Sequence, residues 1–200
     1  MSTDRFVTGL VLAAGGSSRL GEPKQLLPFG SSTLLGHVLE TARRCGFDQL
    51  LVALGGGSEG VRAAVDLSGA QIVENPAFGE GCSSSIAAAL GVVDPRADAM
   101  VLMLGDQPGV GSETVRTLLA GRDADTPLAA CRYDDGRGHP LAFGRAVFGD
   151  LAELHGDKAV WKLLDRRSDD VVEVRVPGAV PADVDTREDY EAIRAARMSR

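Results

Sequence analysis

The first loop of the chain combines residue types that could bind phosphate. The stretch LAAGGSSRLGEPKQLL, residues 12–27, begins like the small, apolar end of a buried strand, then becomes rich in Gly and Ser and carries Arg19 and Lys24. Glycines let backbone N–H groups approach an anion closely, and the two cations could add charge to such a site. The loop therefore predicts phosphate binding; the simpler alternative is a flexible turn whose charges are solvated.

The residues that follow the glycines exclude a P-loop. Gly16 and Gly21 have the spacing of the two glycines in the motif G-x-x-x-x-G-K-[ST]. Glu22 and Pro23 stand where that motif needs Lys and Ser or Thr, and Pro23 interrupts the helix that would receive the phosphate. A phosphate in this loop would have to be held by a different arrangement.

Two acidic segments offer oxygen ligands for a divalent cation. Asp106 follows the apolar run at residues 99–104, which is typical of a buried strand, and Asp183 and Asp185 precede the predicted last helix. Mg²⁺ is usually held by one or two carboxylates, with phosphate oxygens and water completing its coordination. Asp106 and Asp185 would form such a pair if their backbones are neighbours in the fold. The alternative is that Asp106 only starts a turn and the other two only cap the helix.

A second Gly-rich loop imitates a dinucleotide-binding motif. Gly55, Gly57 and Gly60 match G-x-G-x-x-G between a predicted strand and a predicted helix, and Glu74 stands near the position of a ribose-binding acid. Glu59, however, would place a carboxylate beside the pyrophosphate, and the predicted helix is short. We expect a surface turn here, with dinucleotide binding as the alternative.

The third loop, ENPAFGEGCSSS, precedes an Ala-rich helix and could bind part of a nucleotide. Backbone N–H groups at the start of a helix can hold a phosphate, a ribose or a base edge, and the alternative is ordinary capping by serine. The candidate residues of this loop are Asn75, Gly79, Gly81, Ser83, Ser84 and Ser85. No histidine close in sequence could activate Cys82, so we expect a small filling residue rather than a nucleophile there.

Neither the histidines nor the single tryptophan show a catalytic pattern. His139 and His155 fit neither zinc-ligand spacing nor a Ser-His-Asp order. Trp161, the only tryptophan of the chain, is expected to pack against the core rather than to stack on a ligand.

Apolar runs and helix-period segments alternate along the chain. The predicted strands lie at 6–12, 49–54, 70–73, 99–104, 127–132, 140–143 and 171–176. The predicted helices lie at 32–45, 60–67, 84–93, 112–120, 145–154, 159–166 and 186–197. This alternation predicts one α/β domain over residues 1–200, with a mostly parallel sheet and helices on both faces. Ligands of such a sheet bind at the carboxyl ends of its strands, where the loops described above begin.

The overall composition disfavours several classes of function. The net charge of −7 argues against nucleic-acid binding, which depends on basic surfaces. Cys45, Cys82 and Cys131 are far apart and predict neither a disulfide framework nor a zinc site. The N-terminus has no signal-peptide pattern, and the apolar runs are shorter than a membrane span. We expect a cytoplasmic protein with no nucleic-acid partner and no membrane contact.

Six motifs together resemble a known family. LAAGGSSRLGEPKQLLP, ENPAFGEGCSSSI, GDQPGV, GHPLAF, GDKAVWKLL and DVDTREDY occur in the order found in MobA-like nucleotidyltransferases, and they look most like the molybdenum cofactor cytidylyltransferases. The resemblance covers residues 7–193, approximately. It implies a single-domain, Rossmann-like three-layer sandwich, the nucleotide-diphospho-sugar transferase fold. It also implies Mg²⁺-dependent transfer of a nucleotidyl group from a nucleoside triphosphate to a phosphate on an acceptor, with release of pyrophosphate.

The resemblance also implies roles for individual residues. Arg19, Lys24 and Asp106 would be catalytic, and Mg²⁺ would be held by Asp106 and Asp185, with Asp183 as the other candidate for the second ligand. Nucleotide-binding residues would be Leu12, Ala13, Ala14, Gly15, Gly16, Arg19, Lys24, Asn75, Gly79, Ser84, Ser85 and Gly105. Acceptor-binding residues would be Gly138, His139, Pro140, Gly156 and Asp157, and the stretch 156–161 would face the acceptor.

The same resemblance indicates the substrates and leaves alternatives. Cytidylyltransferases of this family begin LAAG, as residues 12–15 do, so CTP is the expected nucleotide, and molybdopterin is the expected phosphorylated acceptor. A molybdoenzyme or its maturation chaperone would then be a protein partner. In GDKAVWKLL, Ala159 stands for a family Gly and Trp161 for a family Arg, which removes a cation near the acceptor. The alternatives are transfer to a sugar or polyol phosphate, an NAD(P)-binding oxidoreductase using the loop at 55–60, and a nucleotide sensor without activity.

Overall fold

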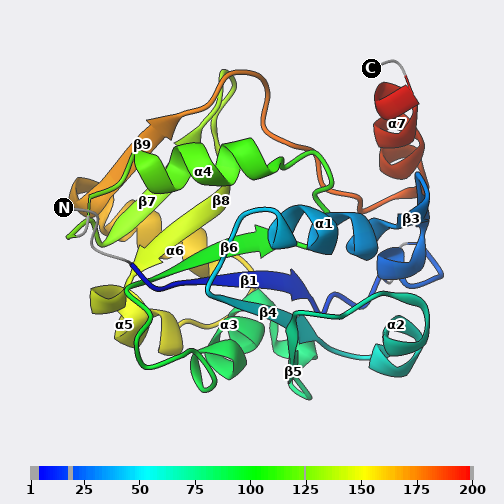
Figure 1. The fold of residues 1–200 in the computed structure, drawn as a ribbon, viewed down its shortest axis with the longest axis horizontal. Coiled ribbons are helices and arrows are strands. Elements are labelled where there is room, and N and C mark those ends of the chain that lie inside the picture. The colour runs from blue at the N-terminus through cyan, green and yellow to red at the C-terminus, as the bar shows by residue number, and fades with distance from the viewer. Residues whose placement is uncertain (1–4, 18–19, 124, 199–200) are drawn as a thin grey trace.

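A central sheet organises the molecule (Figure 1). The structure, a computed structural model, describes residues 5–17, 20–123 and 125–198. In this part of the chain, strands pair in the order β5-β4-β1-β6-β8-β7-β9, and β8 is the one strand antiparallel to its neighbours. Their bounds are β1 (Val7–Ala13), β4 (Gln49–Leu54), β5 (Gln71–Glu74), β6 (Ala99–Leu104), β7 (Leu128–Arg132), β8 (Arg137–Gly144) and β9 (Val171–Arg175).

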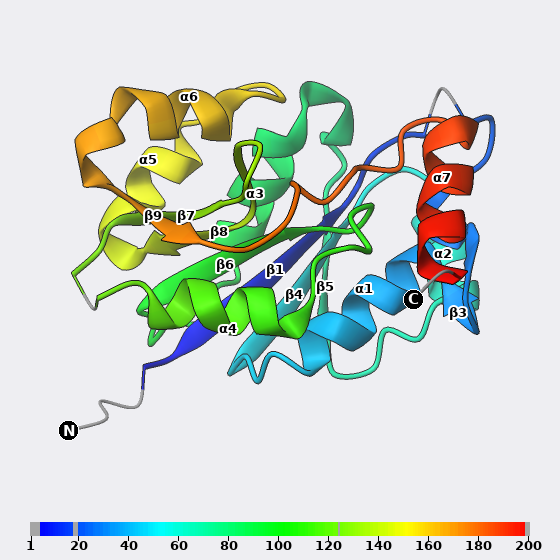
Figure 2. The ribbon, with the colours of Figure 1, turned by 90° about the horizontal axis from the view of Figure 1, so that it is seen from above.

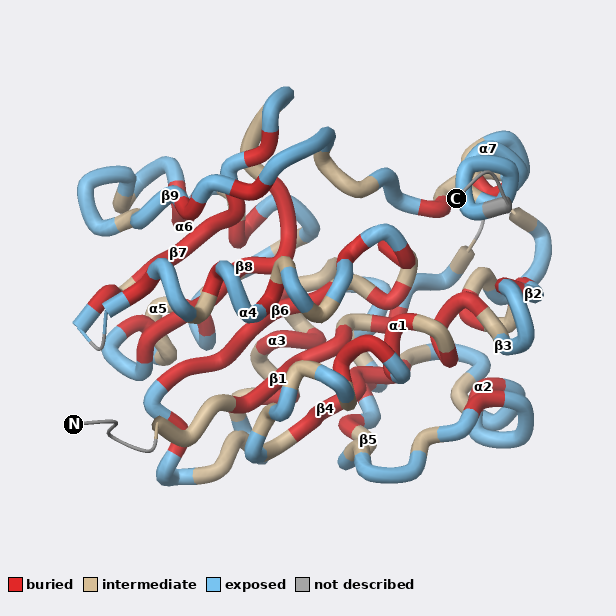
Figure 3. Tube along the Cα trace, turned by 45° about the horizontal axis from the view of Figure 1, so that its top comes forward, coloured by how far each residue is buried: buried red, intermediate tan, exposed pale blue. Residues whose placement is uncertain are grey.

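The middle of the sheet is buried on both faces, as the continuous apolar runs predict. In β6, AMVLML, every side chain except the last is buried, and β1 and β4 beside it are nearly as apolar. Figure 3 shows these central strands as buried, in red, with exposed residues concentrated in the outer helices and loops. A strand covered on both faces cannot alternate polar and apolar residues, which explains the sequence pattern.

Helices cover both faces of the sheet and complete a three-layer α/β domain (Figure 2). One face carries α1 (Leu34–Arg43) and α4 (Ser112–Ala120), which bury Leu35, Val38, Val115 and Leu118 against it. The other face carries α3 (Cys82–Leu90), α5 (Phe148–Ala152) and α6 (Ala159–Arg166). The expected mostly parallel α/β fold is confirmed. Among the described helices, none has the length and apolar character needed to cross a membrane.

Smaller elements gather beyond the carboxyl end of β1. The ribbon of β2 (Pro28–Phe29) and β3 (Ser32–Thr33), the helix α2 (Ser58–Ala64) and the helix α7 (Arg187–Met198) lie at this end of the molecule (Figure 2). A separate apolar cluster holds part of this region together; its buried members are Leu27, Phe29, Leu34, Val184 and Tyr190. This cluster anchors the first loop and the last helix near each other.

For four elements, the predicted first and last residues agree with the structure. The predicted segments 49–54, 99–104, 112–120 and 159–166 coincide with β4, β6, α4 and α6. The helix predicted at 32–45 begins only at Leu34, because Ser32 and Thr33 pair with the 28–29 strand and the Thr33 hydroxyl caps the helix by accepting from Gly36 N. The helix predicted at 145–154 is a 3₁₀ turn (Arg145–Val147) followed by the short α5.

The strand order creates a crevice beside β1. The chain runs from β1 to β4 and β5 on one side and later places β6 on the other side of β1, all parallel. Loops that leave the carboxyl ends of two such strands diverge, which opens a space for a ligand. The residues that follow β1 and β6 are the LAAG loop and Gly105-Asp106.

Candidate active site

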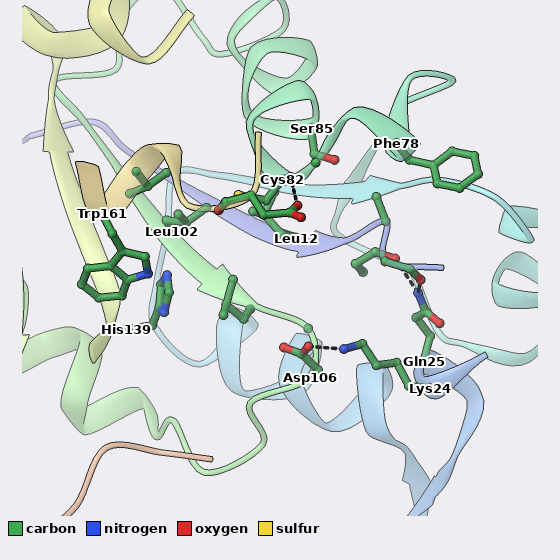
Figure 4. Close-up of a pocket in the computed structure, with 18 residues that line it drawn as sticks. Leu12, Lys24, Gln25, Phe78, Cys82, Ser85, Leu102, Asp106, His139 and Trp161 are labelled. Atoms are coloured by element: carbon green, nitrogen blue, oxygen red, sulfur yellow. Dashed lines mark hydrogen bonds and ion pairs between the residues drawn. The ribbon is translucent and has the colours of Figure 1, made fainter. Parts of the chain in front are cut away.

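A cavity of about 280 Å³ occupies this crevice (Figure 4). Its wall includes Leu12–Gly15 at the end of β1, Lys24 and Gln25 from the first loop, and Leu102, Leu104, Gly105 and Asp106 at the end of β6. The remaining wall is Phe78, Gly81, Cys82, Ser85, His139, Asp157, Val160 and Trp161. Three loops predicted from separate motifs thus meet at one site.

An ion cluster forms one end of the cavity. Lys24 Nζ donates to Asp106 Oδ2 at 2.5 Å and to Asp185 Oδ1 at 3.0 Å, so one ammonium group is shared by two carboxylates. Burial disfavours the charged lysine, but the attraction and hydrogen bonds of Asp106 and then Asp185 outweigh it and raise the pKa of Lys24. Lys24 is therefore a fixed positive charge facing the cavity.

Backbone contacts bring the two acidic segments together. Val184 N donates to the carbonyl oxygen of Asp106 at 3.0 Å, and the buried Val184 side chain belongs to the apolar cluster at this end of the fold. Thr186 N donates to Asp189 Oδ2 and Asp189 N donates to Thr186 Oγ1, a reciprocal cap at the start of α7. These contacts position Asp185 across from Asp106.

Asp183 lies near the cluster in a different environment. Burial, followed by repulsion from Asp106, raises the pKa of Asp183, while a hydrogen bond with Gln107 opposes the rise. The lysine is shared by Asp106 and Asp185. The arrangement favours Asp185 over Asp183 as the partner of Asp106.

The carboxylate pair fits a hard divalent cation. Oxygens of Asp106 and Asp185 already converge on a single positive centre, the ammonium of Lys24. The described residues contain no group of three or more His, Cys, Asp or Glu side chains able to hold a metal ion. A cation held by two carboxylates would take its other ligands from phosphate and water, which is the usual coordination of Mg²⁺ in proteins.

Gln25 holds the loop after β1, a role that the motif analysis missed. The buried Gln25 amide donates to the carbonyl oxygen of Ala13 at 2.7 Å and to that of Gly15 at 3.0 Å. Gly105 supports the same loop: its N–H donates to Leu12 O at 2.8 Å, and a Cβ there would lie 2.9 Å from that oxygen. A glutamine beside a lysine carries no recognisable signal, so only the fold could reveal this contact.

In the described part of the first loop, the segment after Pro23 does not form the helix of a P-loop, as predicted. Pro23 is followed by a single 3₁₀ turn, Lys24–Leu26, and Lys24 N donates to Ser17 Oγ at 2.9 Å. Arg19, the other predicted phosphate-binding cation, lies outside the described residues. Gly16 is described but does not line the cavity.

The third loop contacts the cavity wall mainly through hydrogen bonds to the serines at the start of α3. Asn75 is buried, and its amide donates to Ser84 Oγ at 2.8 Å and Ser85 Oγ at 2.9 Å. Ser85 reaches the cavity, whereas Asn75, Gly79 and Ser84 do not line it. In this arrangement Asn75 orients the serines, and direct nucleotide contact of Asn75, Gly79 and Ser84 stays a prediction.

The predicted acceptor residues approach from β8 and from the loop before α6. His139 and Asp157 line the cavity, while their neighbours Gly138, Pro140 and Gly156 do not. Asp157 Oδ1 accepts from Cys82 N at 3.1 Å, which ties the loop to the start of α3. The thiol of Cys82 donates to Asp157 O at 2.9 Å, and burial raises its pKa, which disfavours the reactive thiolate.

Trp161 packs against the core as expected and also reaches the cavity. The half-buried indole packs against the apolar cluster of its face of the sheet, but it also lines the cavity and meets the His139 ring edge-on at 5.3 Å between centroids. The sequence could not show this because β8 and α6 contribute the two rings. The cavity therefore has an aromatic end as well as a charged end (Figure 4).

Family membership follows from comparison with known proteins. Residues 9–171 match the model of the family described as MobA-like NTP transferase domain. The chain belongs to this family.

Three known proteins illustrate what this chain is similar to. Nicotine blue oxidoreductase from Paenarthrobacter nicotinovorans is 34% identical over 142 residues, which cover 68% of this chain and 69% of that protein. Bifunctional protein GlmU from Burkholderia thailandensis is 36% identical over 142 residues, 69% of this chain but only 30% of GlmU. The crystal structure of Rv0371C in complex with manganese, from Mycobacterium tuberculosis H37Rv, is 47% identical with a TM-score of 0.84 and covers 96% of this chain and 98% of that one.

The glycine motif at 55–60 has a structural explanation in this MobA-like chain. A Cβ on Gly55 would lie 2.7 Å from Ala14 O and from the Phe78 side chain, and Gly57 has a left-handed φ of 81°, so close packing and backbone conformation account for these two glycines. Glu74, which stands near the position of a ribose-binding acid in the alternative interpretation, pairs with Arg62. The loop does not line the cavity at the β1–β6 crevice.

The buried His139 predicts a pH dependence of stability. Burial lowers the pKa of His139 to about 4, whereas an unfolded histidine titrates near about 6.5. Between these values the unfolded state binds the extra proton, so the free energy of unfolding is highest above about pH 6.5 and falls by up to about 3 kcal/mol as the pH drops to about 4. Urea unfolding at a series of pH values measures this slope.

The matched variant His139→Gln isolates the contribution of this one ring. The pKa of His37 is also lowered, by burial and then by Arg197, and adds a slope of the same sign. We expect the variant to lose the His139 part of the slope and keep the rest. Identical pH profiles of wild type and variant would show that His139 is protonated as easily in the folded state as in the unfolded one.

Proposed function

We propose that this protein transfers CMP from CTP to the terminal phosphate of molybdopterin and releases pyrophosphate. The observation that carries the proposal is the ion cluster near the carboxyl ends of β1 and β6, where Lys24 and Asp106 line one cavity with the LAAG loop and Lys24 also bonds Asp185. A lysine and two carboxylates around a loop of backbone N–H groups suit a nucleoside triphosphate with a divalent cation.

The reaction we propose needs no strong general base. An oxygen of the acceptor phosphate attacks the α-phosphorus of CTP, a P–O bond forms, and the bond between the α-phosphorus and the bridging oxygen of pyrophosphate breaks. A phosphate monoester has a second pKa near about 6, so the attacking oxygen is already ionised at neutral pH. Rate enhancement then comes from positioning and from neutralising charge on the phosphates.

Each residue has a distinct task in this proposal. Lys24 binds the triphosphate and stabilises the charge that builds on the leaving pyrophosphate, with Arg19 as a second cation. The loop at residues 13–15, held by Gln25, binds the base, and its LAAG sequence supports CTP. Asp106 and Asp185 would hold Mg²⁺, which when bound neutralises phosphate charge. The manganese complex of the similar Rv0371C supports a divalent metal.

A pyrophosphate-release assay tests the proposal. The protein is incubated with Mg²⁺ and each nucleoside triphosphate in turn, with molybdopterin, with sugar and polyol phosphates, or with no acceptor. We expect pyrophosphate only with CTP and molybdopterin together. Pyrophosphate release with a sugar or polyol phosphate would show that the acceptor belongs to this alternative class and is not molybdopterin. CTP binding without pyrophosphate release would indicate a nucleotide sensor.

One observation favours an oxidoreductase as a second candidate. The relative that is 34% identical is named nicotine blue oxidoreductase. A protein similar to this chain is therefore named for a reaction other than nucleotidyl transfer. An oxidoreductase of this kind would consume NADH or NADPH with an electron-accepting substrate and release no pyrophosphate. Following NAD(P)H absorbance beside the pyrophosphate assay separates the two reactions.

A further inference from the structure

A second cavity lies apart from the one beside the ion cluster. Its volume is about 450 Å³, and the described residues that line it include none of those that line the first cavity. Its wall comes from β2, α1, α7 and the two segments 108–109 and 179–182. Cavities of this size commonly bind small organic molecules. The proposed transfer reaction does not use this space.

The wall of the second cavity is mostly apolar. Phe29, which is buried, contributes an aromatic ring, and Pro108, Val180 and Ile193 contribute aliphatic surface. Among the described residues that line this cavity, Arg197 is the only Lys, Arg, Asp or Glu. A ligand with an apolar body and one anionic group would match this wall.

The guanidinium of Arg197 is positioned by two rings. Its central carbon lies 4.8 Å from the centroid of the Phe29 ring, and its Nη1 lies 3.3 Å from His37 Nδ1. In the described part of the chain, Arg197 forms no ion pair with a carboxylate, whereas Arg187 on the same helix pairs with Glu22. A guanidinium has five N–H donors, so several of them are available to an anionic ligand.

The charge of the wall selects the kind of anion. Burial and then Arg197 lower the pKa of His37, so the imidazole is neutral at pH 7 and adds no second positive charge. A phosphate monoester carries between one and two negative charges at this pH, whereas a carboxylate carries one. A single guanidinium therefore matches a carboxylate, which it can bind through two parallel hydrogen bonds.

Two segments of this wall continue into the ion cluster. Residues 108–109 closely follow Asp106, and residues 179–182 closely precede Asp185. The Gln107 amide donates to Pro181 O in the second segment at 3.1 Å, so the two segments are in contact. A ligand that contacts both segments would restrict their motion relative to each other. It would thereby favour the arrangement in which the two carboxylates face one cation.

We infer that the second cavity binds a small apolar carboxylate, with the carboxylate group on Arg197 and the apolar body against Pro108, Val180 and Ile193. Its binding strengthens the binding of a divalent cation at Asp106 and Asp185. The inference goes beyond the proposed function, because this ligand is neither the nucleotide nor the acceptor and acts as a regulator of cation affinity.

Calorimetry of the nucleotide-free protein tests the binding with 2-naphthoate, a rigid apolar carboxylate. We expect saturable binding of 2-naphthoate, and binding about tenfold weaker for the uncharged 2-naphthamide, because the amide loses the charge-assisted hydrogen bonds. The phosphate 2-naphthyl phosphate should bind no more tightly than 2-naphthoate. Absence of 2-naphthoate binding, equal binding of the amide or tighter binding of the phosphate would overturn the inference.

Variants assign 2-naphthoate to the second cavity. Arg197→Met should weaken its binding about tenfold. Ala196→Trp should abolish it, because Ala196 is an exposed residue of the wall and a large side chain there would fill the space. Arg194→Met changes an exposed arginine of the same helix that does not line the cavity, and it should bind like wild type.

Lys24→Met separates the two cavities, because Lys24 is the cation of the first one. This variant should bind 2-naphthoate like wild type. Loss of binding in Lys24→Met, or wild-type affinity in Arg197→Met, would place the probe in the first cavity and overturn the inference. Circular dichroism checks each fold, and if Arg197→Met does not fold, Ala196→Trp decides.

Electron paramagnetic resonance titration of Mn²⁺ tests the effect on the cation. Saturating 2-naphthoate should strengthen Mn²⁺ binding about threefold in the wild type and have no effect in Ala196→Trp. Because coupling between two ligands is reciprocal, Mn²⁺ should strengthen 2-naphthoate binding by the same factor. Unchanged or weaker Mn²⁺ binding, or no Mn²⁺ binding in either condition, would overturn the regulatory effect.

These measurements are independent of the transfer reaction, because they use neither a nucleotide nor an acceptor. Binding of 2-naphthoate without pyrophosphate release from any substrate pair would retain the second cavity as a ligand site and contradict nucleotidyl transfer. Pyrophosphate release without 2-naphthoate binding would retain nucleotidyl transfer and overturn the inference.

Discussion

Asp106→Asn is expected to lower pyrophosphate release from CTP by about a thousandfold or more while the protein stays folded. The substitution keeps the size and polarity of the side chain but removes one of the two negative charges that share Lys24. A divalent cation would lose a ligand, and Lys24 would turn fully toward Asp185. Steady-state pyrophosphate assays with Mg²⁺, CTP and acceptor measure the loss.

The fold should tolerate this change for electrostatic reasons. Repulsion from Asp106 contributes to the raised pKa of Asp183, so removing the Asp106 charge relieves an unfavourable contact as well as breaking a favourable one. We expect thermal unfolding within a few degrees of wild type. Glu113→Gln, at an exposed acid on α4, is the matched control and should keep full activity. Activity of Asp106→Asn near the wild-type level would contradict the assignment of Asp106 as a metal ligand.

Lys24→Met is expected to have two opposite effects on ligand binding. Loss of the ammonium should raise the KM for CTP about tenfold to a hundredfold, because a partly buried cation is worth that much to a phosphate. The same loss should strengthen Mn²⁺ binding to the nucleotide-free protein about tenfold, because Asp106 and Asp185 no longer hold a competing cation. Steady-state kinetics and electron paramagnetic resonance titration of Mn²⁺ measure the two effects.

General damage to the fold would not weaken CTP binding and strengthen Mn²⁺ binding at the same time. A partly unfolded variant would bind both CTP and Mn²⁺ more weakly. Lys162→Met, an exposed lysine on α6 changed in the same way, should leave both measurements at their wild-type values. An unchanged KM and kcat for CTP in Lys24→Met would exclude the triphosphate role, and unchanged Mn²⁺ affinity would exclude competition between lysine and metal.

Short-range patterns were sufficient to predict most elements and to select several residues that line the cavity. The uninterrupted apolar run of β6 predicts a strand buried on both faces, and the apolar face of α6 has helical period. Glycines and cations at the end of β1, and Asp106 at the end of β6, could be selected because ligands of parallel sheets bind at those ends. These inferences needed only residues close together in the chain.

Short-range patterns failed where two distant elements meet. Periodicity predicts a helix that includes Trp161 and a strand that begins just after His139, but it does not show that the two rings meet at one end of the cavity. The pairing of Ser32 with Phe29 removed the first two residues from the predicted helix. Gln25 carries no signal at all, since its task is to bond carbonyl groups of a loop that the fold brings beside it.

By itself, the sequence determined the α/β class, the central buried strands and the charged residues at their carboxyl ends. Each of these features is indicated by apolar or charged residues that lie close together in the chain. Only the tertiary structure decided that Lys24 lies between Asp106 and Asp185, and that a neutral histidine and a tryptophan close the other end of the same cavity. The physical reason is the strand order: placing β6 beside β1, with the Val184 backbone bonded to Asp106, joins segments that no local pattern relates.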